Sequence, residues 1–515
     1  MTGAEPYRIV ILGGGTAGWM SAAALAGLLP AADYDITLIE SDEIGTVGVG
    51  EATLPHIKTF NDMLGIDEAE FMRETAGTIK LGIEFVDWLR EGARYIHPFG
   101  TFGDRWGGVD FQHHWAQARL DASDDRSLQA YSFAVAACHA NGFEHPNTDP
   151  GSIRSTYSYA YHFDAGLYAR YLRGWATARG VRRLEGKVTG VVRDSESGAV
   201  SALTLEAGAQ VAGDLFVDCS GFRSLLVGQT MQVPWIDWSE WLPCDRALAV
   251  PCLGVEPITP YTRSTARRGG WQWRIPLQHR IGNGYVFSSR FCGEEEARNT
   301  LLANLDGEAL DEPRLLRFAA GRRAQGWAGN CVAIGLASGF LEPLESTSIF
   351  LIQAAAIDLV ALMPRRGEGI DARAVREFNR LFGIHYDRTR DFLVLHYTAN
   401  ERVGEPLWDH VRTMVLPDSL AHRLALFRES AAAPEYSLGL FSRDSWLSVL
   451  EGQGVLPSAA NPLAHRMPAA ERQARLDDLA ARIVLNAAEM TPHGEFLTGY
   501  CASKATARPG AASAA

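Results

Sequence analysis

Three glycines spaced as Gly-x-Gly-x-x-Gly, at Gly13, Gly15 and Gly18, are the first residues whose types and spacing suit a chemical task. They follow an apolar run at residues 8–12, which predicts a strand, and lead into an alanine-rich stretch at residues 19–29, which predicts a helix. Glycine lets such a turn tighten and lets the backbone approach a pyrophosphate at the positive end of the helix. The turn therefore predicts a dinucleotide site.

An acidic residue completes this unit. A second β-like run at residues 35–39 ends at Glu40, 22 residues after the last glycine, where a carboxylate would bind ribose hydroxyls. NAD and FAD share this fingerprint. Two later apolar runs that end in glycine, within residues 215–221 and 331–335, predict further strands of one discontinuous domain, which favours the larger FAD fold.

A second reactive group lies near the end of that domain. Glu345, Ser346, Thr347 and Ser348 follow the predicted strand at 332–334 and precede a predicted helix. The amides of Thr347 and Ser348 would point outward from the helix N-terminus, where amides bind anions. Two other readings stay open: Ser346 or Thr347 is an N-cap, and Glu345 is either a capping carboxylate or a catalytic base.

Other candidate residues are less specific when taken singly. Lys80 lies among apolar residues, although a lone lysine is more often a solvated surface residue. His97 and Phe99 would form a flat wall for a ring substrate, or pack in the core beside a proline. Residues 271–276 resemble an edge strand ended by Pro276.

Composition limits the classes of function. The chain has 515 residues, 47% hydrophobic and 21% charged, which is ordinary for a globular protein of roughly two to four structural units. Its net charge of −13, with no long Lys/Arg run, argues against a nucleic-acid or anionic-membrane partner. The seven cysteines never form Cys-x-x-Cys, and no signal peptide or membrane span is evident. We expect a cytoplasmic protein without a metal site.

These patterns predict an α/β protein whose FAD-binding, Rossmann-like domain is discontinuous and of the single-component flavin monooxygenase type. An inserted β-rich substrate region and a helical C-terminal subdomain complete it. The predicted parts are residues 1–90, 155–230 and 325–355 for the FAD-binding domain, 91–154 and 231–324 for the inserted region, 356–500 for the helical subdomain, and 501–515 for a flexible tail. The helical pattern occupies residues 350–362, 372–395, 420–430 and 469–488.

Several longer motifs run through the chain. They are residues 13–20, 47–53, the segment around Lys80, 161–164, the Trp-x-Trp-x-Ile-Pro motif at 271–276, and 339–347. Together they resemble the flavin-dependent halogenases of the tryptophan halogenase type, over about residues 7–500. The tryptophan-pair motif separates that family from ordinary flavin hydroxylases.

The resemblance implies a two-component enzyme. A separate flavin reductase would supply reduced FAD, and reduced FAD with oxygen and chloride or bromide would give hypohalous acid. The acid would reach a small aromatic substrate through Lys80, which either forms a haloamine or holds the acid by a hydrogen bond. Glu345 would orient the oxidant or take the proton from the ring.

The resemblance also assigns binding residues. The FAD contacts would be Gly13, Gly15, Thr16, Ala17, Gly18, Glu40, Gly50, Ala52, Val188, Leu336 and Ile349. Thr347 and Ser348 would hold the halide, although the best-known members have glycine in place of Ser348. Trp271 and Trp273 would keep organic substrate away from the flavin. A homodimer is compatible with the resemblance.

The substrate is predicted from an aromatic pair and a short loop. His97 and Phe99 match the ring-stacking pair of the family, and Trp446 is either the opposing wall or a packed helix residue. The region at 434–446 is shorter than the insert that grips free tryptophan and carries one tyrosine, Tyr436. We therefore expect indole or a larger indole-bearing molecule at an open site, unless the loop near Tyr436 occludes it.

Three alternatives remain on the sequence alone. A single-component flavin hydroxylase would share the fold but would need NAD(P)H and would not use Lys80. A non-catalytic flavin-binding protein would have no reason to retain Lys80, Glu345 and both tryptophans. A nicotinamide dehydrogenase would not require the two further β units and the helical subdomain.

Overall fold

The glycine turn lies at the carboxyl end of an inner strand in a six-stranded sheet. The computed structural model describes residues 5–43, 50–436 and 438–504, so residues 47–49 of the second motif and residues 505–515 of the predicted tail lie outside it. In spatial order the strands are β20 (Trp327–Ala328), β21 (Cys331–Ala333), β12 (Leu215–Asp218), β1 (Tyr7–Leu12), β2 (Tyr34–Glu40) and β8 (Arg182–Glu185). All neighbours except β20 and β21 are parallel. The predicted strands within 215–221 and 331–335 are thereby confirmed.

Two of the glycines are explained by close backbone approach. Gly13 has φ +114°, and a Cβ there would overlap the carbonyl oxygen of Cys219. A Cβ on Gly18 would overlap the carbonyl oxygen of Gly13. The helix that follows, α1 (Thr16–Leu28), packs against α6 (Ala165–Thr177) and α8 (Thr347–Ala361). The turn can therefore be tight only with glycine at both positions.

A seven-stranded sheet forms the second layer. Its order is β18 (Arg314–Arg317), β14 (Arg246–Cys252), β17 (Ile281–Phe287), β16 (Gly270–Pro276), β15 (Thr262–Arg267), β5 (Gly82–Val86) and β6 (Arg94–Pro98). The expectation of an edge strand at 271–276 is wrong, because β16 pairs on both sides, with β15 and β17. Pro276 is tolerated since it is the last residue of β16. β5 and β6 pair across residue 90, so the predicted segment boundary there falls within a hairpin.

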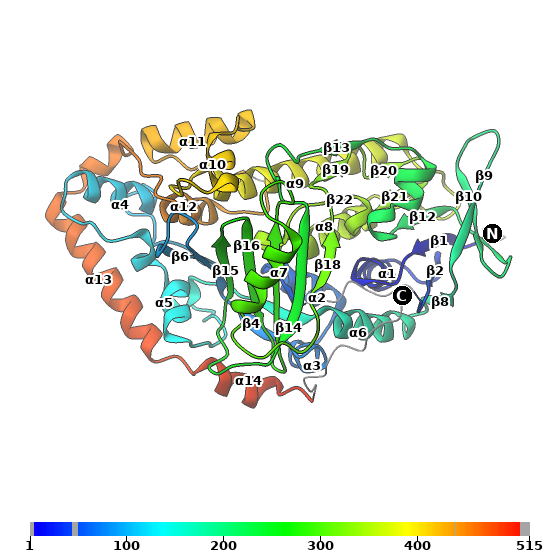
Figure 1. Ribbon diagram of the computed structural model, residues 1–515, viewed down its shortest axis with the longest axis horizontal. Coiled ribbons are helices and arrows are strands. Elements are labelled where there is room, and N and C mark those ends of the chain that lie inside the picture. Colours follow the sequence, from blue (N-terminus) through cyan, green and yellow to red (C-terminus); the bar gives the residue numbers. More distant parts are fainter. Residues whose placement is uncertain (1–4, 44–49, 437, 505–515) are drawn as a thin grey trace.

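Three small sheets complete the β structure. They are β3 (Gly50–Ala52), β7 (Ala160–Asp164) and β4 (Thr78–Lys80); β11 (Gln210–Ala212), β10 (Val200–Leu205) and β9 (Val188–Arg193); and β13 (Trp235–Asp237), β19 (Gly321–Arg323) and β22 (Gly339–Phe340). The first of these places Lys80 at the end of β4, opposite Ala160 of β7. The β9–β10 ribbon projects from the end of the molecule that holds β1 and β2 (Figure 1).

Helices dominate the C-terminal region, as predicted. They are α9 (Ala372–Thr398), α10 (Pro406–Thr413), α11 (Asp418–Ser430), α12 (Arg443–Gly452), α13 (Ala469–Ala488) and α14 (His493–Cys501). The short helices α10, α12 and α14 were not predicted, because two or three turns give too little periodic pattern. The helices earlier in the chain are α2 (His56–Leu64), α3 (Glu68–Glu74), α4 (Phe111–Leu120), α5 (Phe133–Ala140) and α7 (Glu294–Ala303).

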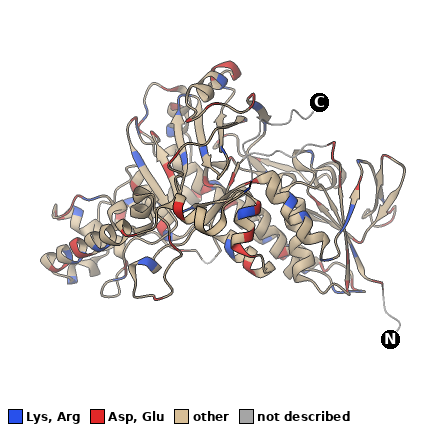
Figure 2. Cartoon of the chain, turned by 90° about the horizontal axis from the view of Figure 1, so that it is seen from below, with Lys and Arg blue, Asp and Glu red and all other residues tan. Residues whose placement is uncertain are grey.

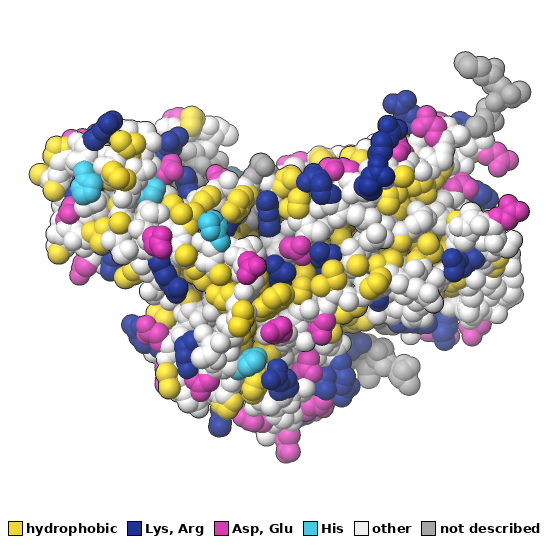
Figure 3. Space-filling view, turned by 90° about the horizontal axis from the view of Figure 1, so that it is seen from above, with side chains coloured by type: hydrophobic (Ala, Val, Ile, Leu, Met, Phe, Trp, Pro, Cys, Tyr) yellow, Lys and Arg dark blue, Asp and Glu magenta, His cyan; other side chains and the backbone are white. Residues whose placement is uncertain are grey.

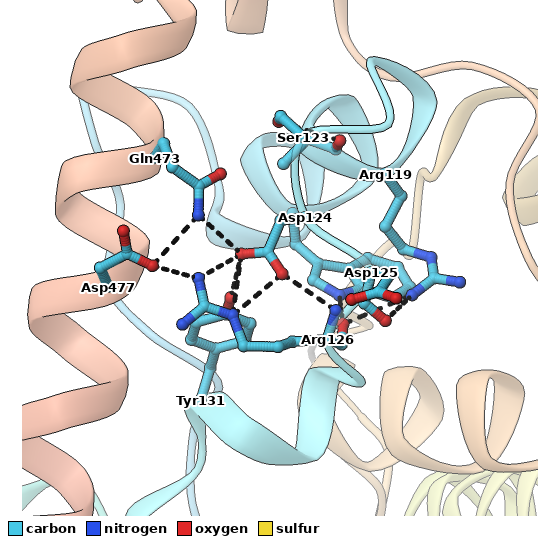
Figure 4. A network of polar contacts seen from close by, with 10 residues as sticks. Arg119, Ser123, Asp124, Asp125, Arg126, Tyr131, Gln473 and Asp477 are labelled. Carbon is cyan, nitrogen blue, oxygen red and sulfur yellow. Dashed lines mark hydrogen bonds and ion pairs between the residues drawn. The ribbon is translucent and has the colours of Figure 1, made fainter.

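A polar network fastens α13 along one end of the molecule (Figures 1 and 4). Asp124, in the segment after α4, accepts a hydrogen bond from Tyr131 Oη at 2.8 Å and is paired with Arg126. Arg126 Nη2 also lies 2.6 Å from Asp477 Oδ1, and Gln473 Nε2 donates to the same oxygen at 3.1 Å. The network ties α13 to the inserted region.

The surface carries mixed charge. Basic and acidic segments are interspersed in Figure 2, and Figure 3 shows hydrophobic side chains among charged ones on the face seen from above. Within the described residues, no helix has the length and apolarity needed to cross a membrane. The same residues contain no group of three or more His, Cys, Asp or Glu side chains arranged to hold a metal ion. All seven cysteines are buried and unpaired.

Candidate active site

A cavity of about 640 Å³ lies over the glycine turn. Ten of the eleven predicted FAD contacts line it: Gly13, Gly15, Thr16, Ala17, Glu40, Gly50, Ala52, Val188, Leu336 and Ile349. Gly18 does not line it, because it is buried where α1 packs over the turn. The volume is in the range of cofactor sites.

The cavity suits a dinucleotide at its glycine end. The turn and the N-terminus of α1 supply positive backbone dipoles for a pyrophosphate. Glu40 Oε2 accepts from Trp19 Nε1 at 3.2 Å, and Arg173 lies 3.4 Å from Oε1. A Cβ on Gly14 would overlap the Glu40 carboxylate, so the turn and the acid lie against each other. The residues present therefore fit the adenosine diphosphate part of FAD.

Lys80 is fully buried beside this cavity. Its Nζ donates to the Thr53 carbonyl at 2.9 Å and to Ser346 Oγ at 2.9 Å, and it lies 5.1 Å from the centre of the Phe99 ring. Burial lowers the pKa of Lys80 to about 7, although the charge of Glu345 opposes this shift. The expectation that a lone lysine is solvated does not hold here.

Ser346 connects Lys80 to the cavity. It lines the cavity and accepts the hydrogen bond from Lys80, whereas Lys80 and Glu345 are not among the described residues that line it. Ser346 is the N-cap residue of α8, as one reading predicted, but it has φ +59° and its side chain makes no cap hydrogen bond. Thr347 begins α8 and is buried, and Ser348 lines the cavity.

Glu345 is held by two imidazoles. It ends the short 3₁₀ turn Pro343–Glu345 and is fully buried. His97 Nδ1, from β6, lies 2.8 Å from Oε2, and His396 Nε2, from α9, lies 2.8 Å from Oε1. Burial alone would raise the pKa of Glu345, but the two imidazoles outweigh it and lower the pKa to about 2.

Each of the two hydrogen bonds that His396 makes needs its own proton. His396 Nδ1 lies 2.8 Å from the Phe392 carbonyl oxygen, which can only accept, so Nδ1 carries a hydrogen. An ionised Glu345 oxygen also only accepts, so the contact between Nε2 and Oε1 needs a second proton. His396 was not predicted, because its partner is 51 residues away and only the fold brings them together.

Trp271 and Trp273 lie on one internal strand, β16. Trp273 lines the cavity, and its ring fills space that Gly284 leaves open on β17. Trp271 is fully buried and donates from Nε1 to Glu342 Oε2 at 2.7 Å, where Tyr397 Oη also donates. Burial raises the pKa of Glu342 to about 7 against these two donors. The hydrogen bond to Glu342 thus fixes the orientation of the Trp271 indole.

An aromatic cluster extends from Lys80 toward the C-terminal helices. The His97 and Phe99 rings meet edge to face at 6.1 Å, and His97 lies 5.6 Å from Phe392. Phe441 stacks on Phe392 at 3.8 Å and lies 6.1 Å from His97. Trp446, on α12, meets Phe392 edge to face at 5.0 Å. Phe392 and Phe441 were not predicted, because single phenylalanines give no signal in the sequence.

This fold and this site together define a flavin-dependent halogenase. The sequence profile of the family described as "Tryptophan halogenase" matches residues 8–469, and the chain belongs to that family. The chain is 37% identical over 511 residues to tryptophan 6-halogenase SttH of Streptomyces toxytricini, which covers 93% of this chain and 96% of that one.

Solved structures are similar over nearly the full length. The flavin-dependent halogenase Xcc4156 from Xanthomonas campestris has a TM-score of 0.93 at 46% identity, covering 98% of this chain and 100% of its own. The flavin-dependent halogenase BrvH from Brevundimonas sp. BAL3 has a TM-score of 0.92 at 42% identity, covering 96% and 99%. The protein is an enzyme, and its family uses reduced FAD and halide.

Proposed function

We propose that this enzyme halogenates an electron-rich aromatic ring, indole or an indole derivative, and that Lys80 delivers the halogen. One observation carries the proposal: the buried Lys80 amine is bonded to Ser346, which lines the cavity, and lies in the same cluster as Glu345. The relatives named for tryptophan halogenation support the indole class of substrate.

The cofactor would be held by the cavity. When bound, reduced FAD from a separate reductase supplies, with oxygen, the oxidising power that turns halide into hypohalous acid. The glycine turn and Glu40 would hold its adenosine diphosphate part. Thr347 and Ser348, at the start of α8, would hold the halide, since a helix N-terminus favours an anion. Trp271 and Trp273 would close this side to organic substrate.

On the other side of Ser346, Lys80 would transfer the halogen and Glu345 would accept a proton. The neutral amine of Lys80 attacks hypohalous acid, forming an N–halogen bond and releasing water. The ring then takes the halogen from nitrogen and loses one proton, and a proton must return to that nitrogen to restore the neutral amine. Glu345 would accept the proton from the ring and pass it to the nitrogen, and His396 and His97 hold its two oxygens in place.

The ring would lie against His97 and Phe99. Phe441 and Trp446 extend this aromatic surface toward α12, with Trp446 as part of the opposing wall. Several expectations stay predictions: chloride or bromide as the preferred halide, a homodimer, a cytoplasmic location and the domain boundaries.

The test is product analysis by mass spectrometry. The protein is incubated with FAD, a flavin reductase, NADH, oxygen, and bromide or chloride, with indole and with tryptophan in separate reactions. We expect a halogen isotope pattern on indole that requires the reductase. Hydroxylated product, or reduction of FAD by NADH without the reductase, would instead identify a flavin hydroxylase. Tight FAD binding with no product from any indole would identify a non-catalytic flavin-binding protein.

A further inference from the structure

Two arginines next to the aromatic cluster form no ion pair with any carboxylate of the described residues. Arg423, on α11, is 9% exposed, and its guanidinium lies 4.0 Å from the centre of the Trp446 ring and 4.3 Å from that of Tyr436. Arg388, on α9, lies 4.9 Å from the centre of the same Tyr436 ring. Its Nη1 is buried and has no hydrogen-bond partner among the described residues. Both guanidiniums thus converge on Tyr436.

The two carboxylates close to Arg388 along α9 are engaged elsewhere. Asp391 is paired with Arg390 and accepts from Ser419, and Asp387 is paired with Arg322. Within the described part of the chain, which contains every Asp and Glu, none forms an ion pair with Arg388 or Arg423. Stacking on aromatic rings leaves the N–H edges of a guanidinium available.

Arg388 lies on the same face of α9 as His396, which contacts Glu345. Arg388, Phe392 and His396 are spaced four residues apart on α9, so they follow one face of the helix. Eight residues of helix rise about 12 Å. His396 meets Glu345 at one end of this face, Phe392 packs in the aromatic cluster in the middle, and Arg388 lies at the other end.

We propose that Arg388 and Arg423 bind a carboxylate on the substrate, so that the substrate is an aryl acid whose acidic group is carried on a flexible arm. A buried, unpaired guanidinium is unfavourable, and a carboxylate would pair with it and accept its hydrogen bonds. A neutral ring such as indole would leave both charges unpaired. Halogenation of this substrate rests on the proposed function, but binding of its carboxylate to the two arginines does not.

Calorimetric titration of the full chain tests this directly. Indole-3-butyrate is compared with its carboxamide, which has the same shape and no charge. We expect the acid to bind at least about tenfold more tightly than the amide. Arg423→Gln should bring this ratio close to one, and Arg423→Lys should restore part of it. Arg380→Gln makes the same charge change on α9 at an exposed pair with Glu377 and should leave the ratio unchanged.

The ratio separates binding from structural damage. Equal affinity for acid and amide in the wild type would overturn the proposal, and so would an Arg423→Gln variant that weakens both ligands equally. Arg388, which is only half-buried, provides a second variant, Arg388→Gln, if Arg423→Gln does not fold. Because calorimetry needs no turnover, an acid preference in a protein that halogenates no indole would contradict the proposed function and leave the carboxylate site intact.

Discussion

Lys80 differs chemically from a lysine in water, because burial of its amine disfavours the charged ammonium form. It has no exposed surface, and among the described residues only Thr53 and Ser346 accept its hydrogen bonds. An ammonium has no lone pair, so only the neutral amine can attack hypohalous acid. Burial that lowers the pKa of Lys80 to about 7 makes this form available near neutral pH.

The first prediction concerns pH. The rate of ring halogenation, measured with saturating substrate, should rise as pH increases through about 7, because Lys80 loses its proton there. Glu345, whose pKa is lowered to about 2, stays ionised throughout and adds no step. A rate that falls over this interval would favour a charged Lys80 that holds hypohalous acid by a hydrogen bond.

The second prediction concerns His396. His396→Gln removes the imidazole next to Glu345 Oε1, so the pKa of Glu345 should rise and kcat should fall by about 10- to 100-fold. KM should change little, since His396 contacts the carboxylate of Glu345 and not the proposed position of the substrate ring. The pH profile should gain an acidic limb, because Glu345 now protonates at higher pH.

His422→Gln is the control, since His422 is an exposed histidine on α11. It should match the wild type in kcat and pH profile. If His396→Gln raised KM alone and left the pH profile unchanged, His396 would have only a structural role.

Single residues were predicted from the sequence only where a motif contained them. Lys80, Glu345 and His97 belong to recognisable segments, and the structure brings them together. The bond between Lys80 and Ser346 joins positions 266 residues apart, and no local pattern reports such a pair. The same holds for Arg423, which in the sequence resembles any surface arginine of a helix.

At the scale of elements, β16 shows what a local pattern omits. Its residues and Pro276 suggested an edge strand, but pairing with β15 and β17 is decided by segments that lie elsewhere in the chain. In this central position the strand that carries Trp271 and Trp273 is paired on both sides. The helix α13 was predicted with both ends correct, and α9 with the correct start and an end three residues early, because many turns repeat the same pattern.

The third prediction tests the packing of β16 against β17. In Gly284→Ala a Cβ would overlap the Trp273 ring, so the free energy of unfolding should fall by about 1 to 3 kcal/mol. Gly174→Ala is the matched control, because nothing lies within 4 Å of its Cβ on α6. Alanine stabilises a helix interior by about 0.5 to 1 kcal/mol relative to glycine. Thermal unfolding of the wild type and of both variants measures these changes in stability. Equal melting temperatures for Gly284→Ala and Gly174→Ala would contradict the packing of Trp273 against Gly284.

At the scale of the whole molecule, the fold was predictable because the βαβ unit combines strand, glycine turn, helix and acid in fixed order. The two later strands joined the same sheet, as their apolar runs indicated. The arrangement of the remaining sheets was not predictable, since it depends on pairings between distant segments. The result is a cavity on one side of Ser346 and a buried lysine on the other.

The most direct measurement separates these two sides. Wild type and Lys80→Met are each supplied with reduced FAD, oxygen, bromide and indole, and two products are quantified: bromoindole, and hypohalous acid captured by a chemical trap. Lys80→Met should lose bromoindole by at least about 100-fold while still releasing hypohalous acid, because the lysine acts only on delivery. Bromoindole formed by Lys80→Met at the wild-type rate would contradict delivery through Lys80.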